Sequence, residues 1–74
     1  MRKWTSLPLR LFLDEESLSQ TKAANMFGVT QPAISQMCLG DREMVVYQQF
    51  DEAEEKLFFR LIEHKEIGIG SLPG

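Results

Sequence analysis

Three polar side chains, Gln31, Ser35 and Gln36, lie on one side of a short helical pattern whose other side is apolar. The apolar positions recur with the helical period of about 3.6 residues, at Ala33, Ile34, Met37 and Cys38. Amide and hydroxyl groups carry the donors and acceptors that pair with base edges in the major groove of DNA. The three side chains are therefore candidate base readers.

A turn that contains glycine connects this helix to an earlier one at residues 20–27, which Ser19 can cap. The apolar face of the earlier helix falls at Ala23, Ala24, Met26 and Phe27. Gly28 can adopt φ > 0 and end the first helix, and Thr30 can cap the second, with Pro32 in its first turn. Two helices joined in this way, with a polar outward face on the second, form a helix-turn-helix pattern. A simple helical hairpin is the alternative.

Two stretches carry a family resemblance, QTKAA at residues 20–24 and GVTQPAISQ at residues 28–36. They resemble the matching segments of the Cro repressors of lambda-type bacteriophages. The similarity runs without gaps to Arg42 and more loosely through residues 44–46. It covers about half of the chain strongly and implies a helix-turn-helix protein that binds DNA.

The resemblance also implies roles for individual residues. It implies DNA base contacts at Gln31, Pro32, Ser35, Gln36 and Arg42. It implies DNA phosphate contacts at Gln20, Thr21 and Lys22. The chain departs from the family at Pro32, where a small polar residue is expected, and beside Arg42. Asp41 and Glu43 flank that arginine where the family often has glycine and a basic residue, so strong phosphate binding is not expected there.

The chain of 74 residues has the length of one domain with a small core, for which oligomerisation often adds stability. With 43% hydrophobic and 26% charged residues, it is globular rather than disordered. No apolar run approaches the roughly twenty residues of a membrane span, and residues 7–13 do not form a signal peptide. A single cysteine, Cys38, suits a reducing compartment. We therefore expect a cytoplasmic location, on the DNA of a bacterial host cell.

Enzyme chemistry is not expected. His64 and Cys38 are the single histidine and the single cysteine, and neither has metal-ligand spacing, a nucleophile motif or a phosphate loop around it. The acidic run at residues 14–16 indicates a solvated helix face, because no acid or base partner is near. We expect no catalytic residue, no cofactor, no metal ion, no small-molecule ligand and no membrane contact.

The second half of the chain allows two interpretations. Residues 44–50 are rich in strand-forming side chains, and alternation places residues 45, 47 and 49 on the face opposite residues 44, 46, 48 and 50. In the first interpretation residues 56–62 return as an antiparallel strand. In the second, Asp51 caps a helix over residues 51–65, which local propensity favours. The family resemblance and the need of a strand for a partner favour the hairpin. The predicted fold is therefore α+β, with three N-terminal helices that contain the helix-turn-helix and a C-terminal antiparallel β-hairpin.

The two ends of the chain are predicted to be extended. Residues 1–6 are expected to form an arm on which Trp4 either covers the core or touches DNA, and Pro8 fits the first turn of the first helix. Residues 67–74 are expected to form an extended tail of the single domain, which spans residues 1–74. Because the family often dimerises through this region, three apolar residues are predicted at a dimer interface: Ile67, Ile69 and Leu72.

Two functional hypotheses follow. The first is a sequence-specific transcriptional repressor of phage or prophage origin, which binds an inverted-repeat operator as a homodimer with its second helix in the major groove. The second is an interaction module of antirepressor or antitoxin type that keeps the helix-turn-helix shape and binds DNA weakly. Glu43 and the acidic second half of the chain are the features that favour the second hypothesis.

The charge distribution predicts how DNA binding depends on salt. The formal net charge is −3, residues 1–50 are neutral overall, and residues 17–40 carry Lys22 as their sole charged side chain. Few phosphate contacts release few counterions, so the affinity for a specific site should fall less steeply with salt than for basic relatives. A titration of the binding constant against salt concentration measures the slope. A steep slope, which means many phosphate contacts, would contradict the prediction.

Overall fold

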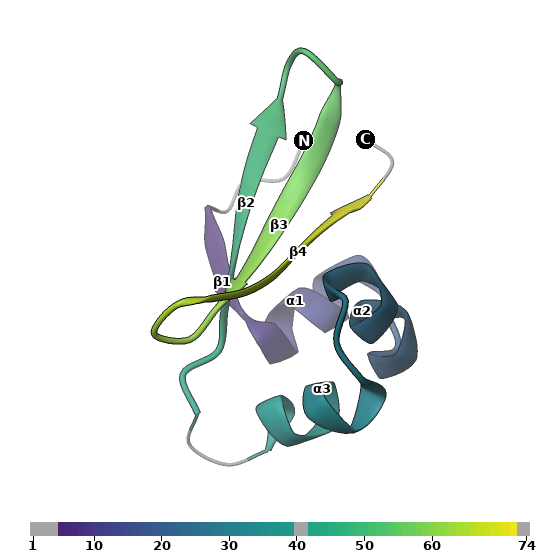
Figure 1. Ribbon diagram of the computed structural model, residues 1–74, viewed down its shortest axis with the longest axis vertical. Helices are drawn as coiled ribbons and strands as arrows, with labels where there is room; N and C mark the ends of the chain where they lie inside the picture. Colours follow the sequence, from purple (N-terminus) through teal and green to yellow (C-terminus); the bar gives the residue numbers. More distant parts are fainter. Residues whose placement is uncertain (1–4, 40–41, 73–74) are drawn as a thin grey trace.

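The computed structural model describes residues 5–39 and 42–72 of the chain (Figure 1). Its elements follow in the order β1 (Ser6–Pro8), α1 (Leu9–Glu16), α2 (Gln20–Phe27), α3 (Gln31–Cys38), β2 (Val45–Asp51), β3 (Lys56–Ile62) and β4 (Glu66–Leu72). The strands form one antiparallel sheet in the order β1-β2-β3-β4. The helices gather at one end of this sheet, and the β2–β3 hairpin projects beyond them at the other.

The predicted α+β fold with its C-terminal hairpin is confirmed, and the alternative, a helix over residues 51–65, is wrong. Asp51 does not cap a helix, because its Oδ1 accepts hydrogen bonds from the backbone N–H groups of Ala53 and Glu54, at 2.9 and 3.3 Å, and so closes the hairpin turn. Beyond the turn, Phe59 and Leu61 are fully buried. Burial against other elements therefore overrides the helical propensity of this segment.

Two strands were not predicted from the sequence. At the N-terminal end, Pro8 does not lie within the first turn of α1, but ends β1 and immediately precedes the helix. At the C-terminal end, the segment expected to be a tail is extended but paired, because β4 lies along β3 from Glu66 to Leu72. Trp4 and the last two residues of the expected tail lie outside the described residues.

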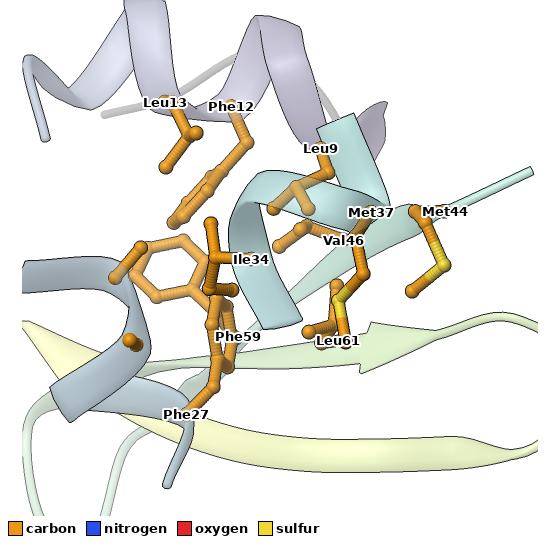
Figure 2. Close-up of a cluster of buried hydrophobic side chains, with 12 residues drawn as sticks. Leu9, Phe12, Leu13, Phe27, Ile34, Met37, Met44, Val46, Phe59 and Leu61 are labelled. Carbon is orange, nitrogen blue, oxygen red and sulfur yellow. The ribbon is translucent and has the colours of Figure 1, made fainter. Parts of the chain in front are cut away.

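The helices and the sheet share one buried core (Figure 2). Phe12 of α1 lies at its centre, with its ring centroid 4.9 Å from that of Phe59 in β3 and 6.0 Å from that of Phe27 in α2. Tilted aromatic pairs of this kind add roughly 0.5–1.5 kcal/mol to the stabilisation from burial alone. From α3, Ile34 and Met37 point into the same core. The core therefore fixes α3 relative to the sheet.

Two glycines let α2 approach the C-terminal strand closely. A Cβ atom at Gly68 would lie 2.3 Å from the carbonyl oxygen of Phe27, and one at Gly70 would lie 2.6 Å from the carbonyl oxygen of Met26. Since both obstacles are helix backbone, a side chain at either position could be accommodated only if α2 or β4 moved. The residue type at these positions therefore sets the distance between β4 and the helix-turn-helix.

The substitution Gly68→Ala should destabilise the fold by roughly 1–3 kcal/mol, because it overpacks a contact with backbone that has no free rotamer. Urea unfolding followed by circular dichroism measures the change. Ser71→Ala is the matched control, since Ser71 is exposed on the same strand and its removal should cost less than about 0.5 kcal/mol. Equal stability of the two variants would contradict the assigned role of Gly68.

Candidate nucleic-acid interface

The starts of α2 and α3 are held by side-chain caps, and a glycine separates the two helices. The hydroxyl of Ser19 accepts a hydrogen bond from the backbone N–H of Lys22 at 3.1 Å, and that of Thr30 accepts one from the backbone N–H of Ala33 at 3.2 Å. Gly28 ends α2 in the left-handed conformation, with φ of 74°. These local signals, which the sequence analysis recognised, set the tight turn between the two helices.

The buried apolar side chains of α2 and α3 determine which side of α3 faces solvent. Ala23 and Ala24 are buried on α2, and Ile34 and Met37 are buried on α3. With these side chains in the core, the opposite side of α3 faces solvent. The predicted base-reading residues on this helix differ in exposure: Gln31, Pro32 and Gln36 are exposed, whereas Ser35 is half-buried.

A hydrogen bond joins the first residues of the two helices. The side-chain Nε2 of Gln31, at the start of α3, donates to Oε1 of Gln20, at the start of α2, over 2.7 Å. The sequence predicts different contacts for these two glutamines, with a base for Gln31 and with phosphate for Gln20. The structure brings them together, so the orientation of one amide depends on the other.

The three predicted phosphate contacts occupy the first turn of α2. Thr21 and Lys22 are exposed, and Gln20 is half-buried by its contact with Gln31. The backbone N–H groups of a helix start carry a partial positive charge that favours anions. One side of the candidate surface therefore combines a helix terminus with a lysine.

Arg42 lies four residues beyond the end of α3 and forms an ion pair with Glu63, in the turn between β3 and β4. Its Nε and Nη2 donate to the two carboxylate oxygens over 3.0 and 2.5 Å. The hydrogen bond to Glu63 is the main cause that raises the pKa of Arg42, and the same bond is the main cause that lowers the pKa of Glu63. The pair joins the connection after α3 to the turn between β3 and β4, at the end of the sheet where β2 begins.

The predicted interface residues in β4 do not share one environment. Ile67 is partly buried against the core of its own chain, whereas Ile69 is 46% exposed. Leu72 pairs with Leu57 in the sheet, and its side chain is not described. Directly opposed residues share a face of the sheet. Tyr47, Arg60 and Ile69 are directly opposed across β2, β3 and β4, and all three are exposed.

Sequence reasoning missed Glu63 and the two glycines of β4. Arg42 and Glu63 are 21 residues apart, and no local pattern signals a contact across that separation. Cys38 was expected to be a small core residue. It is half-buried beside the core, and burial raises the pKa of its thiol while nearby Arg10 acts in the opposite direction.

Within the described ranges, no group of histidine, cysteine and acidic side chains could hold a metal ion. In the same part of the chain, no helix is long and apolar enough to span a membrane.

The two short helices and the capped turn between them define a helix-turn-helix protein, whose second helix has an exposed polar side. A protein-family model described as Cro matches residues 1–56, so the chain belongs to the Cro family. The family consists of DNA-binding repressors of phage type rather than enzymes, and its members typically form dimers. No curated protein and no solved structure matches the chain.

Proposed function

We propose that the protein represses transcription by binding an inverted-repeat operator as a homodimer, with α3 of each subunit in the major groove. The observation that carries this proposal is the oriented amide of Gln31, held by Gln20 at the exposed start of α3. Helix-turn-helix proteins contact bases chiefly with the first residues of the second helix. A dimer bound at a promoter would exclude RNA polymerase by occupying the site.

Gln31 is the principal base reader in this proposal, and Gln36 is the second. The bond to Gln20 uses one of the two N–H groups of the Gln31 amide and leaves its oxygen and the other N–H available. An amide oxygen and N–H together match the N6 and N7 edge of adenine. Pro32 is exposed and would offer an apolar contact for a thymine methyl group, and Ser35, which is half-buried, would supply a hydroxyl. The role of Arg42 is considered below.

The first turn of α2 would anchor the protein on the DNA backbone. Gln20 accepts from Gln31 through its oxygen, so its own amide nitrogen can donate to a phosphate. Thr21 and Lys22 are exposed beside it and supply a hydroxyl and a positive charge. A phosphate contact at Gln20 would thereby fix the register of the base contact at Gln31.

The homodimer would form through the sheet, with β4 at its centre. Ile69 is the best placed of the three predicted residues, because it is exposed and shares a row with Tyr47, which is 43% exposed. Leu72 belongs to the same strand, and Ile67 has part of its surface in its own core. Dimers of this class place their two reading helices about 34 Å apart, one turn of DNA.

Selection from a pool of random duplexes tests the proposed function. The purified protein is used at about 50 mM salt, where phosphate contacts are strong, and the bound duplexes are sequenced. We expect an inverted repeat whose half-sites are about 10 base pairs apart from centre to centre. If nothing is enriched while circular dichroism shows the fold intact, the proposal fails and a protein-interaction module replaces it.

The substitution Gln31→Ala separates base recognition from general DNA affinity. On the selected operator it should cost roughly 1–3 kcal/mol of binding free energy, with little change on random DNA, because the lost contacts are to base edges. Fluorescence anisotropy titrations with both duplexes provide the measurement. Glu52→Gln is the control, since Glu52 is exposed in the β2–β3 turn, away from α3, and should affect neither. Equal losses on both duplexes would show that Gln31 does not read bases.

A further inference from the structure

We propose that Glu63 is a positioning residue that orients Arg42 to recognise guanine, rather than phosphate, beside the C-terminal end of α3. The inference rests on the proposed function and extends it to the turn between β3 and β4. It begins from the bidentate ion pair between the two side chains.

The donors that Glu63 leaves unused form the edge that recognises guanine. A guanidinium group has five N–H donors, one on Nε and two on each terminal nitrogen. Glu63 accepts from Nε–H and from one hydrogen of Nη2. These two donors form the side edge of the planar guanidinium group. The outer hydrogens of Nη1 and Nη2 remain, and these two parallel donors match O6 and N7 of guanine. With its side chain 42% exposed, Arg42 can present this edge to a base.

The carboxylate also makes phosphate a poor ligand for Arg42. A phosphate bound to the outer edge would share the guanidinium with a second anion, and the two negative charges would repel each other. The acceptors of guanine are uncharged, so they meet no such repulsion. Arginine and glutamate are both ionised near neutral pH, and their mutual hydrogen bonds shift both further that way, raising the pKa of Arg42 and lowering that of Glu63. Glu63 therefore reduces general DNA affinity while it favours one base.

Glu63 is held in place by the sheet, and it can therefore orient Arg42, which lies in a loop. Glu63 follows β3 directly, and its backbone N–H donates to the carbonyl oxygen of Lys65 across the turn, over 3.2 Å. The turn is thus held by the sheet, whereas Arg42 lies in the connection between α3 and β2. A bidentate pair fixes the plane of the guanidinium as well as its position. Such orientation before binding lowers the entropic cost of immobilising a long side chain on DNA.

The test uses the selected operator with each guanine replaced in turn by 7-deazaguanine, which lacks the N7 acceptor but still pairs with cytosine. Binding constants are measured for the unaltered protein and for Arg42→Ala, Glu63→Gln and Glu63→Asp. Glu66→Gln is the matched control, because it removes the same charge from the start of β4, where Glu66 pairs with Arg60 at 3.7 Å instead. Circular dichroism verifies the fold of each variant.

We expect the unaltered protein to lose about tenfold in affinity at one guanine of each half-site, and Arg42→Ala to abolish that loss. Glu63→Gln should reduce the loss to about threefold or less and bind random DNA more tightly, with a steeper salt dependence. Glu63→Asp keeps the charge but withdraws the carboxylate, and should also weaken guanine recognition. Glu66→Gln should retain the full loss at the guanine.

Three results would overturn the inference. The loss at the guanine could persist in full in Glu63→Gln, which would mean that Glu63 merely competes with DNA for Arg42. No guanine could be sensitive in the unaltered protein, which would mean that Arg42 does not read this base. Finally, the selection could yield no operator at all. The proposed function itself would then fail, and this failure is distinguishable because the selection comes before any modified duplex is used.

Discussion

The orientation of α3 depends on a single apolar core that the helices and the sheet build together. Phe12 contributes from α1, Phe27 from α2 and Phe59 from β3, and α3 is attached through Ile34. In the proposed function, the uncharged amides on α3 have little long-range attraction for DNA, so specificity would depend on hydrogen-bond distances and angles. Those angles would be only as well defined as the core that supports the helix. The polar outer side of α3 and its buried inner side would then serve the same function.

Much of the helical half could be predicted because its signals are local. Ser19, Gly28 and Thr30 each act within one helical turn, and the structure has each in the predicted role. The strand over residues 56–62 was also predicted with its bounds, because an adjacent run of strand-forming residues needed a partner. Asp51 could not be assigned from local sequence alone, because an aspartate side chain can accept backbone hydrogen bonds at a helix start or in a turn. The packing of the following residues selects the turn.

The features that escaped prediction depend on contacts between distant parts of the chain. β4 contains two glycines, which lower strand propensity, and their reason lies in the backbone of α2. The ion pair of Arg42 spans 21 residues and places a carboxylate beside an arginine that the sequence predicted to contact DNA. The acidic excess of the second half was visible in the sequence, but its position was not. The hairpin tip that carries much of it projects away from α3 (Figure 1).

The segment that matches the Cro family model is shorter than the segment that builds the core and the sheet. The match to the Cro family ends at residue 56, the first residue of β3, yet Phe59, Leu61 and both glycines of β4 come after it. A fragment cut at that boundary would leave Phe12 without the ring of Phe59, which packs against it. The module that could be transplanted, for example as a DNA-targeting fusion partner, must therefore extend through β4. The sheet therefore sets the smallest transferable unit, although the helix-turn-helix itself lies within residues 20–38.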